Sequence, residues 1–145
     1  MRFWDASASV PLIVAEPWSQ EVRELLRADA QMVVWWGSRI ECLSALRRRE
    51  RDGALDPAGA RQSVALLDAL AGAWSEVLPS EIVRGEAERA LAVHPLRSAD
   101  ALQLAAALTW RRSPTRRAEL VCLDERLRDA ASREGFDLLP VEIVV

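Results

Sequence analysis

The sequence contains no lysine, because all 19 of its basic side chains are arginines. A Walker-type phosphate loop, a receiver domain, a Schiff-base enzyme and a lysine-assisted phosphotransferase each need a lysine, so these classes are excluded. No Gly-x-Gly-x-x-Gly run is present, which leaves a dinucleotide-binding fold without support. The net charge of −3 also argues against a surface coated evenly in positive charge for nucleic acid.

Cysteines and long apolar runs are scarce as well. Cys42 and Cys122 lie in apolar segments and have neither the number nor the spacing of a disulfide framework or a zinc site. No apolar run approaches the roughly 20 residues that span a bilayer, and no basic segment leads into a long apolar one. We therefore expect a cytoplasmic protein that has no membrane attachment and keeps both thiols buried.

The residues that are present favour a single α/β domain over residues 1–145. Half of them are hydrophobic, enough to bury a substantial core. Apolar runs of strand length lie at 2–4, 32–36, 75–78, 120–123 and 136–139, with an edge strand or tail at 141–145. Helices are predicted, mainly from apolar residues at helical spacing, over 6–15, 18–30, 39–51, 57–74, 80–94, 96–108 and a segment after Asp124 that ends at Gly135. This alternation predicts a parallel sheet wrapped by helices.

The helix over 96–108 is predicted to be the core helix, because apolar residues surround it almost completely. Ser98 is a good N-cap for it, and Asp100 falls in its first turn, where the helix dipole favours a carboxylate. Charged groups beside such a helix seldom lie buried without a partner. We therefore asked whether other acids converge on Asp100.

Three more acids follow strands or open helices. Asp5 and Asp124 each come after a strand, so both should lie at the carboxyl edge of the sheet, where open α/β sheets bind ligands. Glu41 lies in the opening turns of a helix that follows a strand and therefore begins at the same edge. Each acid alone equally suits a role as an N-cap or dipole partner. All four together favour a shared site.

On these residues the sequence resembles the PIN-domain family, and within it the VapC-type ribonuclease toxins of toxin–antitoxin pairs. The resemblance extends over nearly the whole chain, and the segments that carry it are 3–8, 40–48, 96–108 and 121–131. The resemblance implies about five parallel strands, a homodimer and a cognate antitoxin protein as partner. It also implies an acidic metal site with a supporting hydroxyl, made by Asp5, Glu41, Asp100 and Asp124 with Ser7.

Two departures from the family pattern bear on this interpretation. Cys122 stands two residues before the last acid, where the family usually has Thr or Ser. A residue at this position would help to hold the metal ligands in place. Trp35, Trp36 and Gly37 stand where small or polar residues are usual. These residues concern the substrate groove.

The chemistry that follows is a hypothesis of metal-dependent endoribonucleolytic hydrolysis. Clustered carboxylates repel one another, and Mg²⁺ or Mn²⁺ would relieve this because both prefer oxygen ligands. The ion would lower the pKa of a bound water that attacks the RNA phosphodiester. Asp5, Asp100 and Asp124 would bind it directly or through water. Glu41 would be a further ligand or would orient the water.

Arginine clusters are candidates for holding the RNA, because guanidinium matches phosphate oxygens bidentately. The candidates are Arg47, Arg48, Arg51, Arg112 and Arg116. Such runs are more often solvated helix ends than phosphate-binding sites. His94 is interpreted as a capping or loop residue, and the six tryptophans as core or interface, with Trp18, Trp36 and Trp110 as surface candidates.

Two other functions compete with the nuclease. One is a PIN-fold protein-binding module with an incomplete or inactive metal site. The other is a phosphatase that uses Asp5 as a covalent nucleophile. The phosphatase is disfavoured because such enzymes usually place a second Asp two residues on, where this chain has Ser7, and rely on a lysine.

Overall fold

A computed structural model describes residues 1–143. Five strands form one sheet in the order β3-β2-β1-β4-β5, and every neighbouring pair is parallel. The strands are β1 (Arg2–Trp4), β2 (Met32–Trp35), β3 (Ser75–Val77), β4 (Glu119–Val121) and β5 (Asp137–Leu139). The helices of residues 1–143 are α1 (Ala6–Ile13), α2 (Ser19–Ala28), α3 (Ser38–Arg51), α4 (Pro57–Ala73), α5 (Glu81–Val93), α6 (Ser98–Arg111) and α7 (Glu125–Arg133). The predicted α/β class, a single sheet of about five parallel strands flanked by helices, is confirmed.

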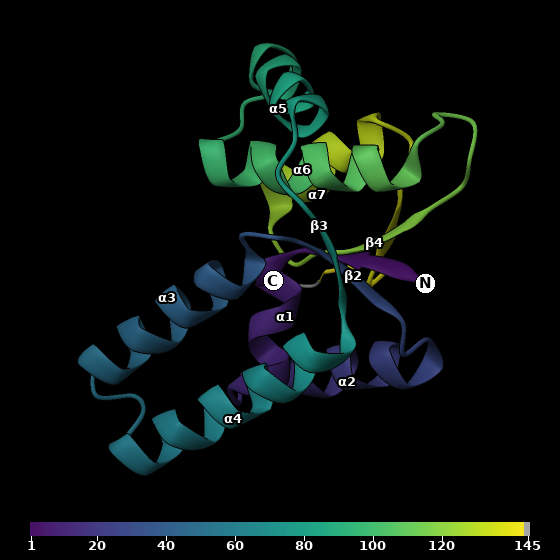
Figure 1. Ribbon diagram of the computed structural model, residues 1–145. Helices are drawn as coiled ribbons and strands as arrows, with labels where there is room; N and C mark the ends of the chain where they lie inside the picture. Colours follow the sequence, from purple (N-terminus) through teal and green to yellow (C-terminus); the bar gives the residue numbers. More distant parts are fainter. Residues whose placement is uncertain (144–145) are drawn as a thin grey trace.

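Two layers of helices cover the two faces of the sheet (Figure 1). Helices α5, α6 and α7 lie on one face, and α1 to α4 lie on the other. Neighbouring strand residues alternate between the layers, so that Phe3 and Val33 pack against the first layer and Trp4 and Val34 against the second. Because both faces are covered, these strands read in the sequence as unbroken apolar runs.

Helix α6 is the core helix that the sequence predicts. Its interior carries a row of alanines and Leu104, all fully buried. The expected capping role of Ser98 is wrong, because Arg97 is the N-cap and Ser98 is the first helical residue. Arg97 already has the extended backbone of a cap, and its carbonyl accepts a hydrogen bond from Ala101 at 2.9 Å. Asp100 still falls in the first turn.

The ends of α5, α6 and α7 are joined by a polar cluster in which His94 and Arg111 are buried, Glu134 is partly buried and Arg89 is exposed. His94 Nε2 lies 2.8 Å from the Glu134 carboxylate, which also receives two hydrogen bonds from Arg89. Arg111 donates to the Glu134 carbonyl at 2.6 Å and lies over the Phe136 ring. His94 is the C-cap residue of α5, as expected, and gains an acidic partner 40 residues away.

The C-terminal segment forms no strand over residues 141–143, and positions 144 and 145 of the predicted edge strand or tail lie outside the described residues. None of the helices in residues 1–143 combines the length and apolar character needed to cross a membrane.

Candidate active site at the carboxyl edge of the sheet

Asp5 lies at the junction of the two central strands. It follows β1 directly, and its backbone N–H donates to the Val121 carbonyl at the end of β4 at 2.9 Å. Its carboxylate caps α1, with Oδ2 accepting from the backbone and the hydroxyl of Ser7. The Ser7 hydroxyl in turn accepts from the Leu123 N–H at 2.9 Å. The predicted supporting role of Ser7 thus has a geometric basis, since it joins Asp5 to the chain that leaves β4.

Asp124 lies three residues beyond the end of β4 and is the N-cap of α7. One of its oxygens, Oδ1, accepts from the Leu127 N–H at 2.9 Å. Asp5 and Asp124 therefore do both things that the sequence allowed, because each caps a helix and each stands at the carboxyl edge of the sheet.

Cys122 is buried between these two acids. Its Sγ lies 3.6 Å from Asp5 Oδ2 and 3.7 Å from the Ser7 hydroxyl. A thiol is a weaker donor than the Thr or Ser hydroxyl usual at this position in the family that the sequence resembles. The carboxylate of Asp5 is therefore supported mainly by Ser7.

Glu41 and Asp100 approach the edge from helices on opposite faces of the sheet. Each lies in the first turn of its helix, α3 and α6 respectively. Gln103 bridges the two helices, donating from Nε2 to Glu41 Oε1 at 3.1 Å and to the Ser38 hydroxyl at 3.0 Å. Gln103 is 1% exposed. The sequence analysis missed this residue, although a glutamine one turn after Asp100 in an otherwise apolar helix was a usable signal.

The electrostatics place the four carboxylates at one locality. Burial raises the pKa of Asp5, against the lowering effect of its hydrogen bonds to Ser7, and the charge of Asp124 raises it further. Burial and the charges of Asp5 and Asp100 raise the pKa of Glu41 to about 7. Burial and the charges of Asp124 and Asp5 raise the pKa of Asp100 to about 6. Each acid thus repels at least one other.

The donor chemistry fits a hard divalent cation, which would relieve that repulsion. In residues 1–143, however, no three His, Cys, Asp or Glu side chains stand together as a ready-made ligand set. The two observations are compatible for Mg²⁺, which keeps several waters and commonly takes one or two protein carboxylates. Asp5, Glu41, Asp100 and Asp124 are the residues that could hold such an ion, partly through water.

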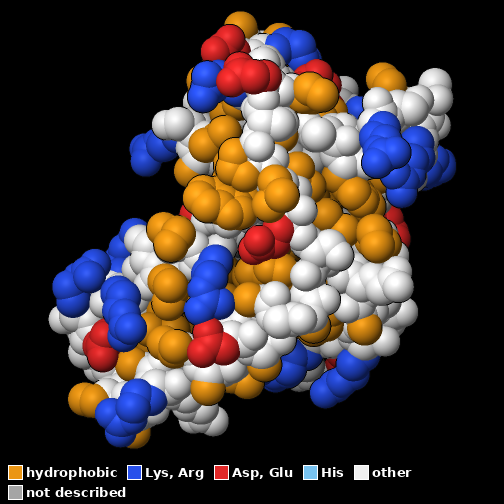
Figure 2. All heavy atoms as spheres, in the orientation of Figure 1, with side chains coloured by type: hydrophobic (Ala, Val, Ile, Leu, Met, Phe, Trp, Pro, Cys, Tyr) orange, Lys and Arg blue, Asp and Glu red, His pale blue; other side chains and the backbone are white. Residues whose placement is uncertain are grey.

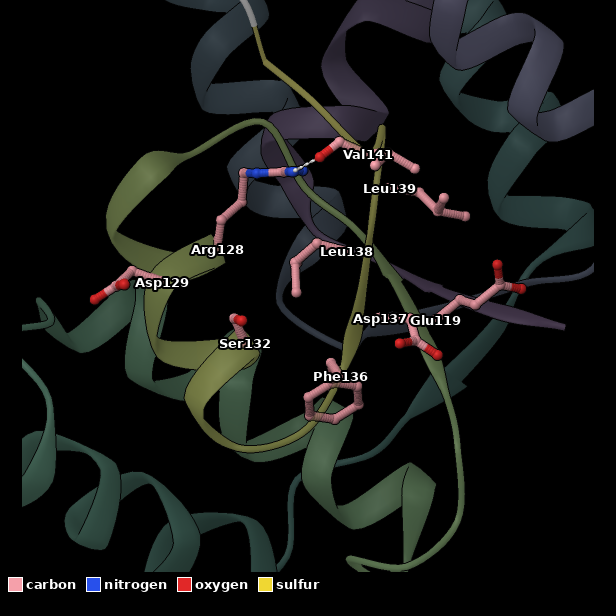
Figure 3. A pocket seen from close by; sticks show the side chains of 9 residues that line it. All are labelled: Glu119, Arg128, Asp129, Ser132, Phe136, Asp137, Leu138, Leu139 and Val141. Carbon is pink, nitrogen blue, oxygen red and sulfur yellow. Dashed lines mark hydrogen bonds between the residues drawn. The ribbon is translucent and has the colours of Figure 1, made fainter.

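A hollow of about 430 Å³ between α1 and α3 borders this acidic edge. Ser7, Glu41, Ser44 and Arg48 are among the residues that line it. Another hollow, about 640 Å³, lies between α7 and β5 (Figure 3). We do not assign the site there because none of the four acids lines it, and Arg128 in its wall is already bonded to the Cys122 and Pro140 carbonyls.

The predicted arginines divide into two groups. Arg48 is exposed beside Glu41 in the smaller hollow, Arg47 forms an exposed ion pair with Glu50, and Arg51 is exposed at the end of α3. Arg112 and Arg116 follow the far end of α6, roughly 18 Å along the helix axis from Asp100. The structure therefore brings Arg48 to the acids and leaves the loop of Arg112 and Arg116 at the opposite edge of the sheet.

No family model and no curated protein matches the sequence. Among solved structures, a chain of a toxin–antitoxin complex from Klebsiella pneumoniae is similar, with a TM-score of 0.65 and 15% sequence identity. The match covers 99% of this chain and 97% of that chain. The likeness establishes the fold. At this identity it carries over the architecture along nearly the full length, and not the individual site residues.

Proposed function

We propose that the protein is a metal-dependent endoribonuclease of the PIN-domain, VapC-like toxin type. The proposal is carried by the burial of carboxylates near one another at the carboxyl edge of the sheet, where burial first and the charges of neighbouring acids second raise the pKa values of Asp5, Glu41 and Asp100. Membership of the fold shared with a chain of a toxin–antitoxin complex supports the same conclusion.

In this proposal the carboxylates of Asp5, Asp100 and Asp124 hold Mg²⁺ or Mn²⁺ directly or through water. A bound ion of this kind supplies a Lewis acid for the phosphodiester and lowers the pKa of a coordinated water. Glu41, whose pKa of about 7 suits proton transfer near neutral pH, orients the attacking water or completes the ligand set. Arg48 contacts a phosphate of the RNA from the hollow beside Glu41.

The proposed partners are an RNA substrate in the cytoplasm, a cognate antitoxin protein and a second copy of the chain in a homodimer. An antitoxin would place a peptide in the acidic groove and occupy it with a basic side chain. The carboxylates of Glu41 and Asp100 suit such a contact because each carries unrelieved negative charge above its raised pKa.

An RNA cleavage assay on the purified protein tests the proposal. We expect internal cuts in single-stranded RNA with Mg²⁺ or Mn²⁺, loss of cutting with excess EDTA, and recovery when the ion is restored. Cleavage that persists undiminished after exhaustive chelation would overturn the metal-dependent mechanism. If the protein is shown to bind the metal and still does not cleave RNA, the proposed nuclease function is overturned.

A PIN-fold protein-binding module is the second candidate function. It is favoured by the lack of a ready-made cluster of three ligands within residues 1–143. Calorimetric titration of Mg²⁺ and Mn²⁺ separates the two, because a binding module gives no heat of specific binding and the nuclease binds the ion at the four acids.

A further inference from the structure

Trp36 is the one exposed tryptophan of the six, with 53% of its surface accessible. It follows β2 directly, and its N–H donates to the Val77 carbonyl at 3.0 Å, which joins the carboxyl ends of β2 and β3. The next residue, Gly37, lies so close to the Trp35 indole that a Cβ there would fall 2.5 Å from Trp35 Nε1. The indole of Trp36 is therefore displayed to solvent from a firmly packed backbone.

Trp36 forms one side of a hollow of about 420 Å³. The residues that line it include the apolar side chains of Trp36, Pro79, Val83 and Leu102 and the charged side chains of Glu81 and Arg84. Arg84 pairs with Glu81 at 3.2 Å, but their side chains are 70% and 84% exposed, so the pair is worth little and Arg84 is available to a ligand. A flat apolar wall with a polar rim matches a nucleobase, which is apolar on its faces and polar on its edges.

The hollow lies at the same carboxyl edge of the sheet as the four acids, because Trp36 directly follows β2. Strand β2 pairs with β1, so Trp36 stands about one strand spacing, roughly 4.8 Å, along the sheet edge from the strand that ends at Asp5. Leu102, which lines the hollow, belongs to the same turn of α6 as Asp100, and Gln103 bonds to Ser38 just beyond Gly37. An RNA strand with one phosphate at the four acids can therefore place a neighbouring base against Trp36.

We propose that this hollow binds an unpaired base of the RNA strand, stacked on Trp36 with its edge toward Arg84, next to the bond that is cut. The proposal rests on the nuclease function. Figure 2 shows hydrophobic side chains gathered over the middle of one face of the molecule. Leu78 and Ile82, 62% and 68% exposed, extend the apolar surface beyond the hollow. A second copy of the chain is the competing occupant, and the test must separate the two.

The test measures binding of a labelled single-stranded RNA of about ten nucleotides by fluorescence anisotropy. The whole chain carries Asp100→Asn so that the RNA stays intact. The second probe is an abasic ribose-phosphate strand of the same length, which keeps the charge and lacks the bases. Trp36→Ala, Trp36→Phe and the control Leu91→Ala, which removes an exposed side chain near the other end of α5, are compared in this background.

We expect Trp36→Ala to weaken RNA binding on the order of tenfold to a hundredfold, because one base–aromatic stack is lost. Trp36→Phe should keep most of the affinity, Leu91→Ala all of it, and the abasic strand should bind equally to every variant. Equal binding of RNA by Trp36→Ala and its parent would overturn the proposal. If Trp36→Ala weakens binding of the RNA and of the abasic strand equally, the proposal is overturned as well. It is also overturned if sedimentation shows that Trp36→Ala converts a dimer to monomers and both strands bind more weakly, because the surface is then an interface between copies of the chain.

The same measurements distinguish this site from the nuclease itself. If the wild-type protein does not cut RNA but Trp36→Ala still weakens RNA binding, the base site is supported and only the nuclease function is refuted. Metal-dependent cleavage with no dependence of binding on Trp36 refutes only the base site.

Discussion

Gln103 donates a hydrogen bond to Glu41 at 3.1 Å, from a helix on one face of the sheet to a helix on the other. That bond lowers the pKa of Glu41 against the larger effect of burial. Glu41 is thereby held at the sheet edge by a residue that itself cannot ionise.

Replacing Gln103 with Leu removes this restraint while keeping the side chain's approximate volume. We expect the affinity for Mg²⁺ or Mn²⁺ to fall about tenfold, as is usual when a group that orients a ligand is lost. Calorimetric titration measures the change. Gln103→Glu serves as the comparison because it keeps the shape of the side chain, loses the N–H that donates to Glu41 and adds a negative charge. Unchanged metal affinity in Gln103→Leu would show that the bridge does not position Glu41.

Asp100→Asn should reduce RNA cleavage by about a hundredfold or more, because a neutral amide holds a divalent cation far less well than a carboxylate does. Asp129→Asn is the matched control, since Asp129 is exposed on α7 and pairs only with Arg133. Circular dichroism verifies the fold of both variants. Full activity in Asp100→Asn would remove Asp100 from the site.

Metal binding should strengthen as the pH rises from 5 to 8. Asp100 and Glu41, with pKa values of about 6 and about 7, lose their protons across this range and become ligands. In thermal melts, Mg²⁺ should raise the Tm of the wild type by more at pH 8 than at pH 5. At a hundred times the dissociation constant, the added stability is about 2.7 kcal/mol. A shift independent of pH would contradict carboxylate ligation by these two residues.

Glu41→Gln should stabilise the metal-free protein at pH 8 and have little effect at pH 4. The folded-state pKa of about 7 lies above the ordinary value of 4.5, so the unfolded chain loses its proton first as the pH rises. The free energy of unfolding of the wild type therefore falls as the pH rises from about 4.5 to about 7, and this effect is constant at higher pH. Denaturant melts in EDTA across this range measure the difference, with the exposed Glu88→Gln as control.

Gly37→Ala should destabilise the protein by about 1 to 3 kcal/mol, because the new methyl group would collide with the buried Trp35 indole. The backbone of Gly37 is of the ordinary right-handed type, so the cost is one of packing alone. Gly85→Ala in α5 is the control, with nothing within 4 Å of the added carbon, and should gain about 0.5 to 1 kcal/mol. Denaturant unfolding of both variants compares the two sites.

Much of the fold was readable from the sequence because local signals agreed with the tertiary structure. The apolar run at 32–36 predicted β2, and Asp56 with Pro57 predicted the start of α4, where Asp56 accepts from Gly59 as an N-cap should. The error at Ser98 arose because the path of the chain through Pro95 and Leu96 had already given Arg97 the cap conformation. Residue preference was overruled by the route into the helix.

The site was less readable because its parts depend on contacts distant in sequence. Asp5 and Asp124 were predicted at one edge of the sheet because each follows a strand, and the repulsion between their charges agrees with that prediction. Gln103 became part of the site only through Ser38 and Glu41, more than 60 residues earlier in the chain. Likewise no local signal told Arg48 from Arg112, which the structure puts at opposite edges of the sheet. The metal-ligand roles of the acids and the RNA contacts of the arginines stay predictions.

The strand order also determines when the acidic edge is assembled during synthesis. The first strand made, β1, sits in the centre and must wait for β4 before its second neighbour is present. Asp5 emerges from the ribosome more than a hundred residues before Asp124 and before the Leu123 amide that anchors Ser7. A nascent chain therefore carries separated fragments of the acidic edge until β4 and the start of α7 have been made.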